Sequence, residues 1–169
     1  MVFIVLRHGE SVWNRENKFT GLTDVSLSEH GRKEAMEAGQ ILSETPFDVV
    51  FTSTLQRTIE TANIVCSKQS TANHREIITH NSLCERDYGD LTGKNKTELT
   101  VLYGEDLVKT WRRSYSEAPP GGENLEDVKR RAGDYFDAEI RPLLNQGKHV
   151  LLVSHGNTLR ALFVHLGIK

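Results

Sequence analysis

Two short apolar runs, one near each end of the chain, limit most strongly how it can fold. The first covers residues 2–6 and is followed by Arg7-His8-Gly9, and the second covers residues 149–153 and is followed by Ser154-His155-Gly156. Short β-branched runs of this kind are typical of buried strands in parallel sheets. Ligands bind at the carboxyl ends of such strands, so each run predicts a histidine at a ligand-binding edge. If the two strands are neighbours, which the sequence leaves open, both imidazoles face one crevice.

Helical and strand-like segments alternate between these runs, and no internal repeat is present. This alternation predicts an α/β fold, a three-layer α/β/α sandwich with a mostly parallel central sheet. A length of 169 residues suits one domain, which we expect to span residues 1–169. Thr52–Thr54 are expected to cap the second helix. The expected strands are residues 47–51 and 76–79, and the expected helices are residues 28–43, 55–67, 96–102, 105–115, 123–145 and 158–166.

Composition excludes several classes of protein. A formal net charge of -2 gives no basic bias towards nucleic acid, so we expect no nucleic-acid partner. Cys66 and Cys84 are too few and too poorly spaced for a disulfide framework or a zinc site, and we expect no metal. No stretch approaches the roughly 18 apolar residues of a membrane span, and residues 1–9 lack the features of a secretory signal. We therefore expect a cytoplasmic protein without membrane contact.

The segment after the first strand is polar and irregular, and it carries Ser11, Asn14, Thr20 and Gly21. Hydroxyls, amides and backbone N–H groups of such a loop are suited to holding phosphate oxygens. An ordinary surface loop is the alternative, although long loops in compact domains are uncommon unless they are functional. Arg57 adds to this pattern, because a cation in the first turn of a helix opposes the helix dipole. An anion held at that helix N-terminus would account for it.

Residues 83–93 form a second unusual segment, in which Glu85, Arg86, Asp87 and Asp90 are crowded around Gly89. This density of charge excludes a core element and leaves either a solvated loop or part of a site. Glu85 is the best-placed carboxylate by context. Further along, Trp111 precedes Arg112 and Arg113, and we expect the indole to pack and fix a helix beside the two guanidiniums.

These residue types point to phosphoryl transfer. Neutral imidazole is a good nucleophile towards phosphorus, and the phosphoramidate that it forms can pass its phosphoryl group onward. Guanidiniums bind phosphate in bidentate fashion, and positioning with cationic stabilisation supplies most of the catalysis of phosphoryl transfer. A partly buried Glu with a raised pKa can protonate the departing alkoxide. Two histidines that end similar apolar runs are much less expected by chance than one.

Several motifs carry a resemblance to a known family. Residues 6–14 with 19–21, 85–93 with 95–96, 111–115 and 154–160 resemble the histidine phosphatase superfamily, and within it the cofactor-dependent, or 2,3-bisphosphoglycerate-dependent, phosphoglycerate mutases. The resemblance covers nearly the whole chain. The Arg-His-Gly start specifies only the superfamily, whereas the Glu-Arg-Asp-Tyr-Gly and Trp-Arg-Arg-Ser-Tyr stretches are much more diagnostic of the mutases.

The resemblance implies interconversion of 3-phosphoglycerate and 2-phosphoglycerate in glycolysis and gluconeogenesis, primed by 2,3-bisphosphoglycerate without a metal. His8 would be the phosphorylated nucleophile and Glu85 the proton donor and acceptor. Arg7, Arg57 and His155 would hold the transferring phosphoryl group. The partners would be small phosphorylated three-carbon acids, and a homo-oligomer is possible. The implied substrate-binding residues are Glu10, Ser11, Asn14, Thr20, Gly21, Arg86, Tyr88, Lys96, Arg112, Arg113, Gly156 and Asn157.

One departure from the family keeps other functions open. Members usually continue for several tens of residues beyond the helix ending near Leu166, with another strand and a tail that covers the site, so we expect the domain to lack these parts. With an incomplete cover, water could intercept phosphohistidine and favour a phosphomonoester phosphatase. A third alternative is an inactive phosphometabolite-binding protein. Another departure is Cys84, where many relatives carry Asn.

Overall fold

The computed structural model describes residues 1–70 and 76–168 and has a parallel sheet at its centre. Its four strands follow the order β1-β4-β2-β3, and all three pairings are parallel. The strands are β1 (Phe3–Arg7), β2 (Val49–Thr52), β3 (Glu76–Thr79) and β4 (Val150–Ser154). The first and last strands in sequence are therefore neighbours, which answers the question that the sequence left open.

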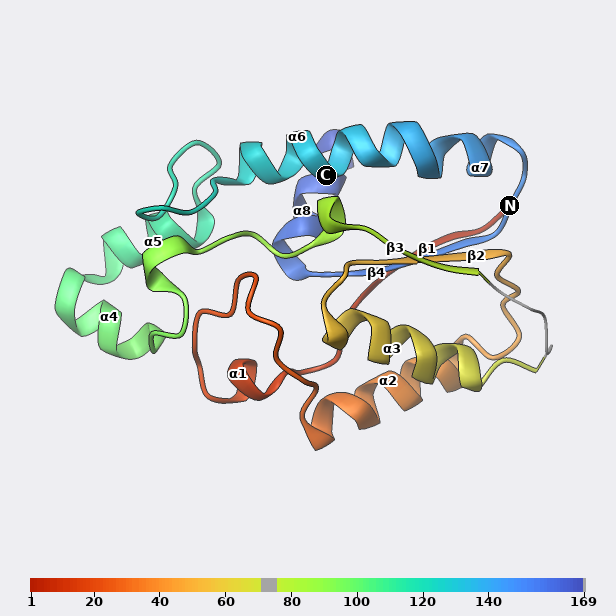
Figure 1. Ribbon diagram of the computed structural model, residues 1–169, viewed down its shortest axis with the longest axis horizontal. Helices are drawn as coiled ribbons and strands as arrows, with labels where there is room; N and C mark the ends of the chain where they lie inside the picture. The colour runs from red at the N-terminus through yellow and green to blue at the C-terminus, as the bar shows by residue number, and fades with distance from the viewer. Residues whose placement is uncertain (71–75, 169) are drawn as a thin grey trace.

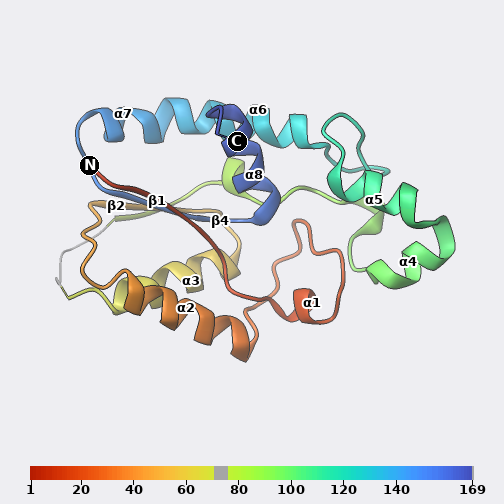
Figure 2. The same ribbon diagram turned by 180° about the vertical axis from the view of Figure 1, so that it is seen from behind.

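Helices cover both faces of this sheet (Figures 1 and 2). Helices α2 (Glu29–Ile41) and α3 (Gln56–Ser67) lie on one face. On the other lie α6 (Leu125–Tyr135), α7 (Arg141–Asn145) and α8 (Gly156–His165). The predicted three-layer α/β/α sandwich is confirmed.

Strand β4 shows why the core has two halves. Successive side chains of a strand point to opposite faces, so Val150 and Leu152 pack in the cluster beneath α6 and α8. Leu151 and Val153 pack instead in the cluster beneath α2 and α3. All four side chains are fully buried, which explains the uninterrupted apolar run in the sequence. Burial on both faces fixes the strand, and therefore the position where the chain leaves it at His155.

The caps of the helices agree with the sequence in one case and differ in another. Ser28 Oγ accepts a hydrogen bond of 3.0 Å from Gly31 N and caps α2 as expected. The prediction that Thr52–Thr54 cap α3 is wrong, because the N-cap residue is Leu55 and has no side-chain cap. Asp24 Oδ1 accepts from Gln56 N at 2.7 Å instead. The capping carboxylate comes from a distant loop, so the local sequence around the helix could not reveal it.

The helix predicted over residues 123–145 is interrupted. Asn124 caps α6 through a reciprocal capping box with Asp127, and a π-helical turn over Phe136–Ile140 separates α6 from α7. Pro142 follows this turn, and its ring has no N–H to donate and would crowd the carbonyl four residues earlier in a regular helix. The wider turn accommodates the proline while the helix continues in the same direction (Figure 1).

A lobe of short helices extends beyond the carboxyl ends of the strands (Figures 1 and 2). It has its own apolar cluster of Phe19, Leu91, Leu99 and Val108, against which Trp111 packs as predicted. This lobe supplies one wall of the space in front of His8. Its helices are α1 (Val12–Arg15), the short 3-10 turn η2 (Gly89–Leu91), α4 (Lys96–Tyr103) and α5 (Glu105–Arg113). Another short 3-10 turn, η1 (Asn81–Leu83), lies over the sheet, where Leu83 packs in the core beneath α6 and α8.

Candidate active site

The sheet brings the two predicted histidines together. Arg7 at the end of β1 is in register with Ser154 at the end of β4, so His8 and His155 leave the sheet side by side. Their imidazole rings meet edge to face, with centroids 4.9 Å apart. Both residues are buried.

The His8 ring is held in one orientation. Its Nδ1 lies 2.6 Å from the carbonyl oxygen of Gly9, which fixes Nδ1 as the protonated nitrogen and leaves Nε2 with a free lone pair. Gly9 N donates to Thr61 Oγ1 at 3.2 Å. A Cβ at Gly9 would overlap the backbone of Gly31, so glycine is required where this loop crosses α2.

Both imidazoles are kept neutral. The pKa of His8 is lowered from 6.5 to about 3, mainly by burial and also by the charges of Arg57 and Arg7, against the opposing effect of the hydrogen bond with Gly9. Burial also lowers the pKa of His155 well below its usual range, and His8 and Arg57 add to this effect. His155 Nε2 lies 2.8 Å from Ser53 Oγ, whereas its buried Nδ1 has no hydrogen-bond partner in the described part of the chain. A neutral His8 is the form that attacks phosphorus.

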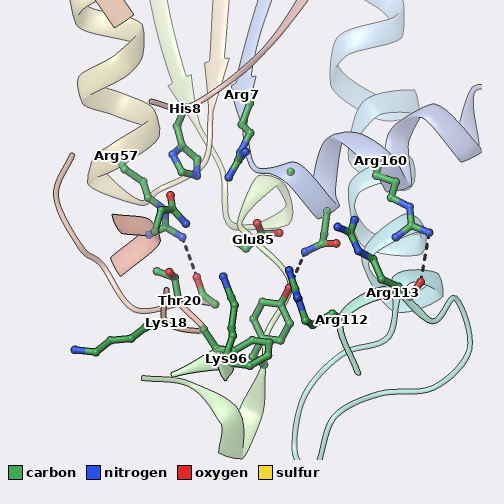
Figure 3. Close-up of a pocket in the computed structure, with 16 residues that line it drawn as sticks. Arg7, His8, Lys18, Thr20, Arg57, Glu85, Lys96, Arg112, Arg113 and Arg160 are labelled. Atoms are coloured by element: carbon green, nitrogen blue, oxygen red, sulfur yellow. Dashed lines mark hydrogen bonds between the residues drawn. The ribbon is translucent and has the colours of Figure 1, made fainter. Parts of the chain in front are cut away.

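His8 lines a cavity of about 320 Å³ at the carboxyl edge of the sheet (Figure 3). Seven of its lining side chains are lysines or arginines, and Glu85 is the only carboxylate among the lining residues. Such a wall suits a small ligand with several negative charges. The lining residues are Arg7, His8, Asn14, Lys18, Phe19, Thr20, Gly21, Arg57, Glu85, Tyr88, Lys96, Arg112, Arg113, Gly156, Asn157 and Arg160.

The cations form two groups on opposite sides of Glu85 (Figure 3). Arg7 and Arg57 lie with His8 at one end of the cavity. Lys96, Arg112 and Arg113 lie at the other end, together with Arg160. A ligand that spans the cavity therefore meets a positive charge at each end and a carboxyl group near its middle.

Arg57 connects the cavity to the loop in front of it. Its guanidinium is fully buried, with Nη1 donating to Thr23 O at 2.8 Å and Nη2 donating to Gly21 O at 2.9 Å. These two bonds fix the loop while the guanidinium still lines the cavity. Arg57, which the sequence predicted to face an anion at the start of α3, therefore also binds two carbonyl groups of the protein.

Glu85 has the properties of a proton donor. Burial raises its pKa above the usual value of 4.5, against the opposing effects of a hydrogen bond from Arg86 N and the charges of Arg57 and Arg7. A raised pKa makes the protonated carboxyl more available as a proton donor than that of an exposed glutamate. Its position between the two cationic ends places this acid beside the middle of a bound ligand (Figure 3).

Uncharged groups complete the wall. Tyr88 Oη accepts a hydrogen bond of 2.9 Å from Asn157 Nδ2, and burial raises the pKa of this phenol. Asn14 lines the cavity, and its Oδ1 accepts from Ser11 N at 3.1 Å. Thr20 Oγ1 is buried without a hydrogen-bond partner among the described residues, and it faces the cavity in Figure 3. A phosphate or carboxylate oxygen of a ligand would satisfy it.

Four of the predicted site residues do not line this cavity. His155 lies behind His8. Glu10 accepts from Ser28 Oγ at 2.6 Å, and Ser11 is a buried cap of α1. Arg86 is completely buried, and its Nε donates to Glu123 O at 2.5 Å. For Glu10, Ser11 and Arg86 the structure therefore shows contacts within the protein, and contact of these residues with a ligand stays a prediction.

Lys18, Phe19 and Arg160 line the cavity but were not among the predicted site residues. Lys18 lies at the rim, where its amine pairs with Glu16 at 2.5 Å. Arg160 follows the second histidine motif by one helical turn, which is the sequence feature that could have identified it. Its Nη2 donates to Arg113 O at 3.3 Å.

Cys84 is buried directly beside Glu85, with its Sγ 3.3 Å from Thr54 Oγ1, and it does not line the cavity.

Within residues 1–70 and 76–168, no three His, Cys, Asp or Glu side chains are grouped so that they could hold a metal ion. In the same residues no helix combines the length and apolar character needed to cross a membrane.

Comparisons with known proteins agree with this geometry. The chain is 46% identical to the 2,3-bisphosphoglycerate-dependent phosphoglycerate mutase of Cytophaga hutchinsonii, over 98% of this chain and 76% of that protein. It is 42% identical to the enzyme of the same name from Chlamydia trachomatis, over 98% of this chain and 83% of that protein. A mycobacterial glucosyl-3-phosphoglycerate phosphatase, solved with VO3, superposes with a TM-score of 0.83 at 28% identity, over 96% of this chain and 79% of that one.

The family profile that matches this chain is the histidine phosphatase superfamily, branch 1, and the match covers residues 3–168. This range contains both strand ends, both histidines and every residue of the cavity wall. The chain belongs to the histidine phosphatase superfamily.

Proposed function

We propose that this chain is the catalytic domain of a 2,3-bisphosphoglycerate-dependent phosphoglycerate mutase. It would interconvert 3-phosphoglycerate and 2-phosphoglycerate, a step of glycolysis and gluconeogenesis. Relatives with 40–46% identity over nearly the whole chain bear that name. The observation that carries the proposal is the presence of a second cationic group, Lys96, Arg112 and Arg113, on the far side of Glu85 from His8.

The second cationic group matters because of what each reaction requires. Hydrolysis of a simple phosphomonoester needs one anion site, beside the nucleophile. A mutase must also hold the carboxylate of the phosphoglycerate, and the second phosphate of the bisphosphate, while either oxygen of the substrate faces His8. Guanidiniums suit this task because they bind both kinds of anion in bidentate fashion.

The residues present fit 2,3-bisphosphoglycerate. This acid carries roughly five negative charges at neutral pH, counting up to two per phosphate. Seven cationic side chains line the cavity, and Thr20 Oγ1 is buried there without a partner among the described residues. Arg7 and Arg57 would hold one phosphate, and Lys96, Arg112 and Arg113 would hold the remaining anions. When bound, the bisphosphate supplies the phosphoryl group that primes His8.

His8 and Glu85 divide the chemistry between them. The free Nε2 lone pair of His8 forms the bond to phosphorus as the P–O ester bond breaks, and protonated Glu85 gives its proton to the departing alkoxide. In the return step a hydroxyl of the substrate passes its proton to Glu85 as its oxygen takes the phosphoryl group from His8. Arg7 and Arg57 stabilise the negative charge on the transferring group in both directions.

Phosphomonoester hydrolysis is the second candidate. The observation in its favour is the close superposition with a mycobacterial phosphatase that is named for the substrate glucosyl-3-phosphoglycerate. The same His8, Arg7 and Arg57 would serve, with water attacking the phosphohistidine. An inactive binding protein is disfavoured because the nucleophile, the acid and the cations are all present.

An enolase-coupled assay separates the candidates. Formation of 2-phosphoglycerate from 3-phosphoglycerate is followed with and without 2,3-bisphosphoglycerate, and phosphate release is measured in the same samples. A mutase isomerises faster than it releases phosphate and depends on the bisphosphate. Phosphate release without isomerisation would replace the mutase proposal with the phosphatase.

The mutase reaction also implies a cytoplasmic protein whose partners are small phosphorylated three-carbon acids.

A further inference from the structure

Glu85 is carried by a segment that has little regular secondary structure. Residues 84–88 lie between η1 and η2 and belong to no helix or strand. Their carbonyl groups, and those just before them, accept hydrogen bonds from side chains of other elements. Ser154 Oγ donates to Leu83 O at 2.8 Å, and Thr158 Oγ1 donates to Cys84 O at 2.7 Å. The position of Glu85 thus depends on side chains that are distant in sequence.

Arg131 of α6 makes more of these contacts than any other side chain in the described chain. Its Nη1 donates to Ser82 O at 2.8 Å and to Cys84 O at 3.0 Å. Its Nη2 donates to Glu85 O at 3.0 Å. One guanidinium therefore holds two carbonyls of the segment, those of Cys84 and Glu85, and the carbonyl of Ser82 just before it.

Glu123 holds both the guanidinium and the other end of the segment. Its Oε1 accepts from Arg131 Nε at 2.8 Å, and its Oε2 accepts from Arg131 Nη2 at 2.8 Å and from Asp87 N at 3.0 Å. The backbone N of Glu123 donates to Asp87 O at 2.9 Å. The ion pair is about three-quarters buried, with exposed side-chain fractions of 23% and 25%. Burial makes it stiffer than a surface pair.

We propose that Arg131 and Glu123 are positioning residues that hold the Glu85 carboxyl at the distance needed for proton transfer. The inference rests on the proposed function, because it takes Glu85 as the proton donor. Neither side chain lines the cavity, so neither binds the ligand directly. Proton transfer needs hydrogen-bond distance, and a misplacement of about 1 Å can cost roughly 10²-fold in rate.

The leaving group provides a selective test. When His8 attacks an alkyl phosphate, the Nε2–P bond forms, the P–O bond breaks, and the alkoxide takes the proton of Glu85. When it attacks p-nitrophenyl phosphate, the oxygen leaves as a stable phenolate and needs no proton. A misplaced Glu85 should therefore slow the first reaction and spare the second, whereas general damage to the fold should slow both.

The experiment measures phosphorylation of His8 in a single turnover by rapid quench, with 2,3-bisphosphoglycerate or p-nitrophenyl phosphate as donor. In Arg131→Met, the alkyl rate should fall roughly 10²-fold while the aryl rate stays near that of the wild type. Arg130→Met is the matched control, because Arg130 lies on the same helix, is exposed, and pairs only with Asp127 among the described residues. It should leave both rates unchanged.

Arg131→Lys keeps the test decisive if the methionine variant does not fold. Lysine retains the charge but lacks the planar guanidinium that reaches three carbonyls and the Glu123 carboxylate. The alkyl rate should therefore again fall while the aryl rate does not, but by a smaller factor than in Arg131→Met. An equal loss with both donors, or no loss with either, would overturn the positioning role. Absence of phosphohistidine in the wild type with both donors would instead overturn the proposed function.

Discussion

Ser53 Oγ lies 2.8 Å from His155 Nε2 and thereby connects the end of β2 to the second histidine of the site. The same hydroxyl lies 2.8 Å from Thr58 Oγ1 in α3, and it accepts from Leu55 N at 3.2 Å. His155 is therefore fixed on one side by buried hydroxyls, while its Nδ1 remains unpaired among the described residues. His155 is thereby held against the ring of His8, with the two ring centroids 4.9 Å apart.

His8→Ala should abolish phosphoryl transfer and leave the fold largely intact. The side chain borders the cavity, so its removal enlarges a space that is already open and creates no closed void in the core. Acid-labile phosphate on the protein, measured after mixing with 2,3-bisphosphoglycerate, should disappear. His30→Ala, on the exposed face of α2, is the control and should retain it. Retention of turnover in His8→Ala would remove His8 from the mechanism.

The free energy of unfolding should depend on pH through the ionisation of Glu85. Burial raises its pKa in the folded state above the ordinary value of 4.5, so between these two pKa values the folded state binds more protons than the unfolded state. The contribution of Glu85 to the free energy of unfolding is therefore complete below pH 4.5 and falls as pH rises, by at most about 1.4 kcal/mol per pH unit.

Glu85→Gln removes this dependence. The stability of the variant relative to the wild type should increase with pH across that interval, as measured by urea unfolding at several pH values. Glu37→Gln, at an exposed position of α2, is the matched variant for removal of a carboxylate from the protein surface. A constant difference for Glu85→Gln would contradict a raised pKa.

Arg57→Lys should reduce turnover by roughly 10²-fold or more, because a single ammonium cannot replace a bidentate guanidinium on the transferring phosphoryl group. It should also destabilise the protein by about 1–3 kcal/mol, since the buried carbonyls of Gly21 and Thr23 lose their donor. Steady-state kinetics and thermal unfolding measure the two effects. Arg15→Lys, at an exposed position of α1, is the control. Activity near that of the wild type would exclude Arg57 from the phosphoryl site.

Arg112→Met should separate isomerisation from simple hydrolysis. Arg112 lies in the cationic group far from His8, so its loss weakens the hold on the carboxylate or second phosphate and spares the first anion site. Isomerisation of 3-phosphoglycerate should fall at least about 10-fold, the loss expected when one charged contact is removed. Release of phosphate from p-nitrophenyl phosphate should change little. An equal loss in both reactions would place Arg112 at the phosphoryl site.

Sequence patterns predicted most of the elements because they depend on local rules. The apolar runs that end at His8 and His155 are strands in the structure, and Ser28 caps the helix that follows it. The cap of α3 could not be predicted in this way. It is the Asp24 carboxylate, which reaches Gln56 N across a loop, and no local pattern records that contact.

The sequence by itself determined which groups are available: two histidines at strand ends, a carboxylate at residue 85, and a surplus of arginines in the loops. Local periodicity and strand-end position suffice for this, because both are properties of neighbouring residues. Only the tertiary structure decided where each arginine acts. Arg86 turns into the protein and Arg131 supports Glu85, while Arg160 faces the cavity. The direction in which a long side chain points depends on contacts between segments that are far apart in sequence. Such contacts exist only once the sheet and the helices have packed together.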